Sequence, residues 1–375
     1  MSRIIKFGDV QIGELAKQHV MDCLNTSQIT MGDKVGQFEQ EWGELFGYKH
    51  NLAVNSGTSA DLCAYLCLYD LGAKRGDEII VPALSFISTS NAVLAAGFTP
   101  VFCDINRYFL NIDETKVESL ITDKTKAIVA VSTMGKPCKM DVLRDICDRH
   151  NLLLIADDCE GHGCSYKGRM MGNWADIATY SCYAAHLIFG GELGVVSTMR
   201  DDLAELVKST RSHGRKSGDL FFNHERFGWN AKATNIHCAI GLESLSKFWD
   251  TFDNRKRNLE LLIWSLKQID YHLYFNGEGM HETTAPHALS MVFRKDDEER
   301  FLRFYKHLED NGIQCKINFR SIPTQQPSFA WMGYKLGDFP EAEFVGRNGL
   351  HCGCHHYLTG DDLRYMINTI LAFFD

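Results

Sequence analysis

Short apolar runs alternate with segments of helical periodicity over roughly the first 200 residues of the chain. Several runs are almost continuously apolar, which is typical of parallel strands whose two faces are both covered. We therefore predict seven strands, at residues 51–54, 78–81, 99–103, 127–131, 152–156, 177–182 and 194–197.

The segments between these runs carry apolar residues three and four positions apart, which is the spacing of one helical face. Residues 59–71 form such a segment, and Gly72 follows as the stop that a helix end favours. Residues 140–150 form another. Helices that alternate with strands predict an α/β fold with a mostly parallel, seven-stranded central sheet.

The pattern changes after about residue 235. Residues 236–266 have helical periodicity with a weak point near 248–253, and the last third suggests a few strands and a closing helix from Asp361. We expect a large domain over 1–245, including an N-terminal segment, and a small α/β domain over 246–375. Residues 212–225, rich in glycine, histidine and basic residues, indicate an active-site loop or a segment that crosses to another subunit.

Composition narrows the class of protein. The 375 residues are 45% hydrophobic and 23% charged, an ordinary mix for a soluble globular chain. The net charge of −9 and the lack of a basic stripe argue against nucleic-acid binding. No apolar run approaches the roughly 18 residues of a membrane span, and no secretory leader is evident. The 13 scattered cysteines then suggest a reducing, cytoplasmic location.

The segment NSGTSA lies between a predicted strand and a predicted helix. Gly57 permits a tight turn, and Thr58 and Ser59 can present hydroxyl and backbone N–H groups to an anion at the helix N-terminus. A plain helix cap by serine or threonine explains the same residues. Taken alone, the segment is a weak indication of a phosphate site.

The segment IADDCEGHG places Asp157 at the end of a buried strand, where open α/β sheets present groups to ligands. A carboxylate there can pair with a protonated pyridine nitrogen and make that ring an electron sink. Glu160, about one turn on, could contact the phenolic oxygen of the same ring. The alternative is that Asp157 and Asp158 only cap the following turn.

Eight blocks follow one another along nearly the whole chain: ITMGDKVGQFEQEWGELFG, NSGTSA, GDEIIVPALSFISTSNAVLAAG, PVFCDINRYFLNID, KAIVAVSTMGKPCKMD, IADDCEGHG, SCYAAH and GWNAKATNIHCAIGLESL. In this order they resemble the DegT/DnrJ family of nucleotide-sugar aminotransferases, which are fold-type I enzymes that use pyridoxal 5'-phosphate (PLP). The order of eight blocks is a far stronger signal than any one of them.

The resemblance implies a role for each matching residue. Gly57, Thr58, Ser59 and Ser181 would form the phosphate cup, and Asn230 would reach the phosphate of a neighbouring subunit's cofactor. Phe86 would stack on the pyridine ring. Asp157 would pair with the ring nitrogen and Glu160 with the phenolic oxygen. A homodimer with shared active sites is implied in the same way.

The chain departs from the family at the sixth residue of SCYAAH, where the aminotransferases carry their Schiff-base lysine and this sequence has His186. Histidine cannot tether the cofactor covalently, but its pKa of about 6.5 suits a general base. This exchange resembles the histidine-bearing 3-dehydratase branch of the family, which acts on sugars such as GDP-4-keto-6-deoxy-D-mannose. In that branch a histidine before glycine, here His213, lies near the sugar.

The resemblance therefore implies a PLP- and pyridoxamine 5'-phosphate-dependent 3-dehydratase of a nucleotide-linked 4-keto-6-deoxy sugar, with glutamate as amino donor. Two alternatives stay open. The protein could be an aminotransferase in which another lysine, such as Lys167, binds the cofactor, or a non-catalytic homologue that only binds it.

Cys352, Cys354, His355 and His356 are closely spaced, as metal ligands often are. Only Cys315 joins the two cysteines within the last 130 residues of the sequence, too few for the four-cysteine iron–sulfur pattern of a related dehydratase branch. We expect these residues to be structural and predict no metal.

Overall fold

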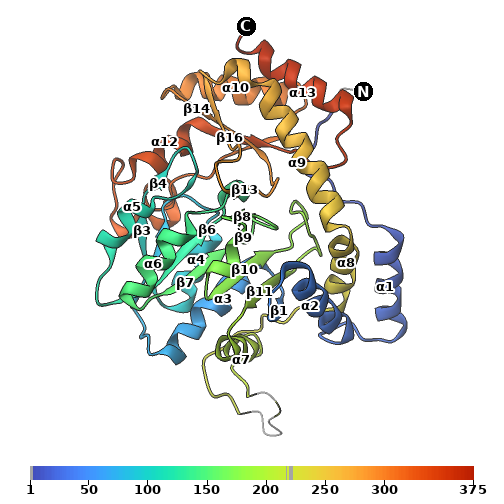
Figure 1. Cartoon of the computed structure of the whole chain (residues 1–375), viewed down its shortest axis with the longest axis vertical. Coiled ribbons are helices and arrows are strands. Elements are labelled where there is room, and N and C mark those ends of the chain that lie inside the picture. The colour runs from blue at the N-terminus through green and yellow to red at the C-terminus, as the bar shows by residue number, and fades with distance from the viewer. Residues whose placement is uncertain (1–2, 217, 219–222) are drawn as a thin grey trace.

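The structure, a computed structural model, describes residues 3–216, 218 and 223–375. Its centre is a seven-stranded sheet (Figure 1). In spatial order the strands are β1 (His50–Val54), β11 (Gly194–Thr198), β10 (Ile177–Ser181), β7 (Leu153–Asp157), β6 (Thr125–Val131), β2 (Glu78–Pro82) and β3 (Thr99–Cys103). Only β11 runs antiparallel to its neighbours in this sheet. Each strand lies within two residues of a predicted one at either end, so the mostly parallel α/β fold is confirmed.

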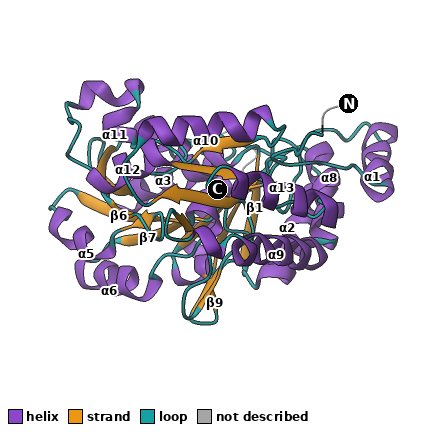
Figure 2. Cartoon of the chain, turned by 90° about the horizontal axis from the view of Figure 1, so that it is seen from above, coloured by secondary structure: helices purple, strands orange, loops and turns teal. Residues whose placement is uncertain are grey.

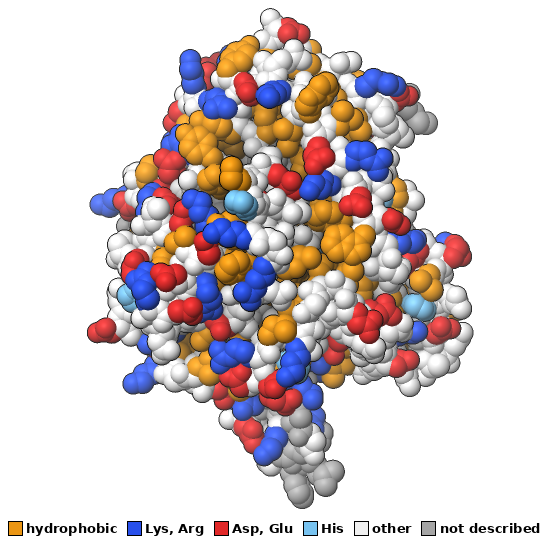
Figure 3. All heavy atoms as spheres, in the orientation of Figure 1, with side chains coloured by type: hydrophobic (Ala, Val, Ile, Leu, Met, Phe, Trp, Pro, Cys, Tyr) orange, Lys and Arg blue, Asp and Glu red, His pale blue; other side chains and the backbone are white. Residues whose placement is uncertain are grey.

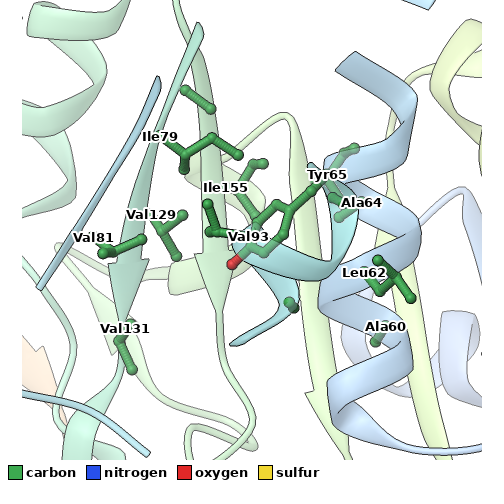
Figure 4. Packing of buried hydrophobic residues seen from close by; sticks show 14 of the residues in the cluster. Ala60, Leu62, Ala64, Tyr65, Ile79, Val81, Val93, Val129, Val131 and Ile155 are labelled. Atoms are coloured by element: carbon green, nitrogen blue, oxygen red, sulfur yellow. The ribbon is translucent and has the colours of Figure 1, made fainter. Parts of the chain in front are cut away.

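The apolar strands are buried on both faces, which explains why they lack a polar side. Along β6, Ala127, Val129 and Val131 face one hydrophobic cluster and Ile128 and Ala130 face another. Figure 4 shows the first cluster, in which β2, β6 and β7 pack against α3 (Gly57–Leu66) and α4 (Ser88–Ala96). The second cluster packs the other face against α2 (Asp33–Phe46), α6 (Met140–His150) and α8 (Asn235–Ser246). Helices therefore lie on both sides of the strands (Figure 2).

Two predicted helices differ in detail from the observed ones. The helix expected at residues 59–71 begins two residues earlier as α3 and continues as a 3-10 turn over Cys67–Leu71. It ends at Gly72, whose φ of 94° is the left-handed value that glycine favours. The long helix expected at 236–266 is interrupted at Lys247, between α8 and α9 (Phe248–Ser265). The weak point in the periodicity therefore marks the junction of two helices.

A second sheet forms in the last third of the chain. Its antiparallel strands, in spatial order, are β12 (Leu273–Phe275), β14 (Leu289–Phe293), β16 (Gly349–Cys352) and β15 (Cys315–Ile317). The helices α9, α10 (Glu298–Asp310) and α13 (Gly360–Ala372) share its hydrophobic cluster. Ile5 belongs to the same cluster and exchanges backbone hydrogen bonds with Gly312 and Gln314. The division into domains at residue 245 stays a prediction.

The helix α1 (Glu14–Asn25) packs on α8. The remaining elements are short or peripheral: the helices α5 (Glu114–Val117), α7 (Asp201–Thr210), α11 (Ile322–Gln325) and α12 (Pro340–Asn348), and the small strands β4 (Ile105–Asn106), β5 (Asn111–Ile112), β8 (Ser165–Tyr166), β9 (Arg169–Met170) and β13 (Glu282–Thr283). Positive and negative side chains are interspersed on the face seen in Figure 3. Within the described ranges, no helix has the length and hydropathy that a bilayer span requires.

Candidate active site

A cavity of about 430 Å³ lies where the carboxyl ends of β7 and β10 meet the four-stranded sheet of the last third of the chain, which we call the small sheet. Open α/β sheets present functional groups to ligands at this edge, and the volume is typical of ligand pockets. Seven of the ten predicted site residues line it, namely Gly57, Thr58, Phe86, Asp157, Glu160, Ser181 and His186. Motifs that are far apart in the sequence therefore meet at one place.

Five residues form what we call the cavity floor: Ser56, Gly57, Thr58, Asp157 and Ser181. The first three belong to the N-terminus of α3. The helix is capped by Ser56, whose Oγ accepts the backbone N–H of Ser59 at 3.1 Å. A serine therefore caps the helix, as one interpretation of the segment expected, and the capping residue is Ser56, directly before Gly57. Ser59 does not line the cavity. The first N–H groups of a helix have no partner inside the helix, so this end can bind an anion.

Gly57 lets the helix approach the end of β10 closely. A Cβ added at Gly57 would lie 2.6 Å from the Cβ of Ser181 and 2.9 Å from the Sγ of Cys159. Both distances are shorter than real side chains adopt. The glycine is therefore required by close packing at the floor.

Asp157 is the last residue of β7 and is 3% exposed. Its Oδ2 accepts a hydrogen bond from Thr89 Oγ1 at 2.7 Å, and its Oδ1 accepts the N–H of Cys159 at 3.2 Å. The second bond is the turn cap that the alternative interpretation expected, yet the carboxyl also borders the cavity. Burial raises the pKa of Asp157 above its ordinary value.

A second carboxyl lies directly behind Asp157. Polar atoms of Asp61, Asp157 and Cys159 all lie within 4.8 Å of one another, the closest grouping of possible metal ligands in the described part of the chain. Asp61 is fully buried and accepts a hydrogen bond from Thr179 Oγ1 at 2.6 Å. Burial, together with the charge of Asp157, raises the pKa of Asp61. Two carboxyl groups are therefore close together at this end of the floor, and burial opposes the ionisation of both.

Glu160 borders the cavity one turn beyond Asp157. Its Oε2 accepts the N–H of Met134 at 2.7 Å, and its Oε1 lies 3.5 Å from Nε2 of His287. Burial raises the pKa of Glu160 to about 7. This carboxyl can therefore hold a proton near neutral pH.

His186 follows β10 and lies on a turn closed by its own N–H, which donates to the carbonyl of Tyr183 at 2.9 Å. Its ring centroid lies 5.2 Å from that of His287 and 5.8 Å from that of His162. Burial lowers the pKa of His186 to about 3, and the positive charges of Arg255 and Lys316 act in the same direction. The imidazole is therefore neutral at physiological pH.

The last third of the chain supplies a side of the cavity that no sequence motif indicated. Lys316 on β15, His351 on β16 and His287 just before β14 all line it, and with His186 we call them the histidine wall. Phe7 lines it as well, with its ring 4.7 Å from the Nζ of Lys316. The only signal in the sequence was a charged or imidazole side chain within β15 and within β16 and another just before β14.

Asn230 and His213 do not line the cavity of their own chain. They lie together beyond α7, where Ser212 and Asn230 form a β-bridge. Lys232 Nζ donates to Asn230 Oδ1 at 2.6 Å and lies 3.3 Å from Nε2 of His213. Residues 217 and 219–222 of the predicted active-site loop lie outside the described residues. The roles expected of Asn230 and His213 stay predictions.

Other residues that the sequence singled out lie elsewhere. Lys167, between β8 and β9, is exposed, pairs with Asp141 at 2.6 Å and does not line the cavity. Cys352 and Cys354 are buried in the cluster of the small sheet, where the Sγ of Cys354 donates to the carbonyl of Pro286 at 3.4 Å. This placement fits a packing role.

Comparison with known proteins places this geometry in a family. A model of the DegT/DnrJ/EryC1/StrS aminotransferase family matches residues 10–371. The chain is 36% identical over 360 residues to GDP-perosamine synthase of Caulobacter vibrioides, a match that spans 94% of this chain and 93% of that protein.

Solved structures show the same fold. Helicobacter pylori PseC, an aminotransferase involved in the biosynthesis of pseudoaminic acid, superposes with a TM-score of 0.92 at 26% identity over 99% of both chains. The E. coli GDP-4-keto-6-deoxy-D-mannose-3-dehydratase with bound hydrated PLP superposes with a TM-score of 0.89 at 25% identity, over 99% of this chain and 100% of that one.

The fold is therefore that of the fold-type I PLP-dependent enzymes, as the resemblance implied. The chain belongs to the DegT/DnrJ/EryC1/StrS aminotransferase family. Because these relatives include both aminotransferases and a dehydratase, membership leaves two reactions to be distinguished by the site itself.

Proposed function

We propose that this protein removes the C3 hydroxyl group of a nucleotide-linked 4-keto-6-deoxy sugar, with PLP and its aminated form, pyridoxamine 5'-phosphate, as cofactor. The observation that carries the proposal is His186, an imidazole at the cavity wall in the block where the family's aminotransferases carry lysine. An enzyme without that lysine cannot tether the cofactor there, yet it keeps a group that can move protons.

The cavity fits this cofactor. The N-terminus of α3 with Thr58 and Ser181 would hold the phosphate, because partial positive charge and N–H donors meet there. The role expected of Ser59, which does not line the cavity, stays a prediction. Phe86 would cover one face of the ring. At the other end, the buried carboxyl of Asp157 suits a protonated ring nitrogen and Glu160 suits the phenolic oxygen.

The residues of this chain then divide the work. When bound, the cofactor would supply a conjugated ring that takes up the electron pair left when its C4′ carbon loses a proton, and that pair then expels the C3 hydroxyl. Asp157 keeps the ring nitrogen protonated. His186 would accept a proton from the cofactor's C4′ carbon and return it to the departing C3 hydroxyl. Glu160, able to hold a proton near neutral pH, would stabilise charge at the phenolic oxygen.

The amino donor and the assembly belong to the same proposal. Glutamate would regenerate the aminated cofactor after each turnover, and a homodimer in the cytoplasm would complete each site. The supporting observation is the position of Asn230 and His213, which lie together away from the cavity of their own chain. A second copy could bring them to it.

Transamination is the second candidate, favoured by the 36% identity to GDP-perosamine synthase. It requires an amine that can reach the cofactor. Among the residues that the structure describes, Lys316 is the one lysine that lines the cavity, so we infer that it, and not Lys167, would have to serve.

Product analysis tests the proposal. The purified protein is supplied with PLP, glutamate and a GDP-linked 4-keto-6-deoxy sugar, and the products are analysed by mass spectrometry. Dehydration predicts ammonia and a deoxygenated keto sugar. An amino sugar would contradict it in favour of transamination, and no product from this or the CDP- and dTDP-linked sugars would favour a non-catalytic homologue.

Borohydride reduction separates the two reactions without substrate. A Schiff base to lysine would be fixed as a pyridoxyl group, which peptide mapping locates. We expect no such adduct in the wild-type protein and none in Lys316→Met, so the two proteins should give the same peptide map. An adduct on Lys316 would overturn the assignment of His186.

A further inference from the structure

Arg255 on α9 is a buried cation that forms no ion pair with a carboxylate of the described residues. It is 3% exposed, its Nε has no hydrogen-bond partner among those residues, and the ionisable groups that act on its guanidinium are Cys354 and Tyr357. Such a group is costly to bury, so its presence at this position requires an explanation. Its contacts provide one.

The guanidinium of Arg255 holds the turn that carries His186. Its Nη1 donates to the carbonyl of Ala185 and its Nη2 to the carbonyl of His186, both at 3.3 Å. The other end of this turn is closed by the N–H of His186 donating to Tyr183 at 2.9 Å. Two donors fixed in one plane can hold two successive carbonyls, which a single ammonium group cannot do as well.

The charge of Arg255 also acts on the imidazole it positions. Apart from burial, the groups that lower the pKa of His186 are Arg255, from α9, and Lys316, from β15. The remaining polar rings around it are those of His162, His287 and Tyr183. Of these groups, Arg255 is the permanent cation, because a guanidinium stays protonated at any physiological pH.

We propose that Arg255 is a positioning residue of this site: its guanidinium fixes the backbone of the 183–186 turn and sets a permanent positive charge on the turn that carries the imidazole of His186. The inference rests on the proposed function, in which His186 must be neutral to accept a proton. It explains why a cation is buried where no carboxylate of the described chain pairs with it. It also assigns a role in the chemistry to α9, a helix that contributes no residue to the cavity lining.

The test begins with the protein free of cofactor and substrate. Histidine-selective isotope labelling and NMR titration give the pKa of His186, whose signal is identified by its loss in His186→Asn. Arg255→Gln removes the charge, Arg255→Lys keeps it, and Arg257→Gln, at an exposed position on the same helix, is the matched control. We expect the pKa of His186 to rise in Arg255→Gln only, and to stay below 6.5 because burial, the larger cause of its low value, remains.

The second arm measures product formation against pH. Because the base must be neutral, a higher pKa of His186 moves the acid limb of the profile upward, by about one pH unit in Arg255→Gln. Arg255→Lys should leave the acid limb in place and lower kcat about three- to tenfold, since it loses one of the two carbonyl contacts. Arg257→Gln should match the wild-type protein in both.

Each outcome decides the inference. A folded Arg255→Gln protein with the wild-type His186 titration overturns it, as does an Arg255→Lys profile displaced as far as that of Arg255→Gln. If Arg255→Gln does not fold, Arg255→Lys carries the test, and wild-type kcat in that variant overturns the positioning role. Because the NMR arm needs no substrate, a titration shift without dehydration would refute the proposed function and leave the effect of Arg255 standing.

Discussion

The cavity floor and the histidine wall differ in how completely their polar atoms are paired. On the floor, both carboxylate oxygens of Asp157 accept hydrogen bonds and Ser56 caps α3. On the wall, Nδ1 of His186 and of His287 have no partner among the described residues. Paired groups are held in place before a ligand arrives, whereas the unpaired imidazole nitrogens, kept neutral by burial, remain free to contact a ligand. The floor is therefore suited to binding and the wall to proton transfer.

Glu160 connects the two regions, and its ionisation gives the largest expected effect on stability. Its pKa is raised to about 7, so the neutral carboxyl favours the folded protein. This contribution is full below about pH 4.5 and is lost as the pH rises through 7, at a cost of about 3 kcal/mol. Glu160→Gln should therefore stabilise the cofactor-free protein at pH 8 by up to that amount.

Urea unfolding of the wild-type and Glu160→Gln proteins at pH 8 and at pH 4.5 measures the gain in stability. Glu205→Gln, at an exposed position on α7, is the control. The gain should vanish at the lower pH, where the wild-type carboxyl is already neutral. An equal gain at both pH values would show that ionisation of Glu160 is not its cause.

Gly57→Ala tests the close packing of the floor. The added Cβ would meet Ser181 and Cys159, so the variant should lose about 1–3 kcal/mol of unfolding free energy and bind PLP more weakly. Gly36→Ala on α2 is the matched control, because its Cβ would meet nothing within 4 Å and should stabilise the helix. Thermal unfolding and PLP titration report both effects. Undiminished stability in Gly57→Ala would mean that α3 can move away from β10.

Ser56→Ala should have a smaller effect than these, a loss of about 1 kcal/mol from removal of the helix cap. Ser59→Ala retains the capping oxygen and should lose less in the cofactor-free protein. Chemical denaturation of both variants gives the comparison. If Ser59→Ala is the more costly of the two, the cap has been assigned to the wrong residue.

The two regions also differ in how far the sequence revealed them. Floor residues sit at strand ends and in the first turn of α3, so Gly57 and Asp157 stand in short motifs whose local structure can be predicted. Lys316 and His351 come from neighbouring strands of a sheet that packs across the cavity, and Phe7 comes from the other end of the chain. Long-range packing of this kind leaves no local pattern to detect.

His186 stands between these cases. Its position followed from the motif in which it replaces lysine, but its environment did not. The neighbouring rings, the buried Arg255 and the resulting low pKa depend on α9 and on the segment before β14. The apolar residues after it, Leu187 and Ile188, are simply buried in the second hydrophobic cluster.

The most direct test of the central claim is the turnover of His186→Asn with PLP, glutamate and the GDP-linked 4-keto-6-deoxy sugar. Loss of a general base should slow product formation by about 10²- to 10⁴-fold, while the absorbance of the bound cofactor shows that the floor still holds it. Undiminished product formation by this variant would contradict the account.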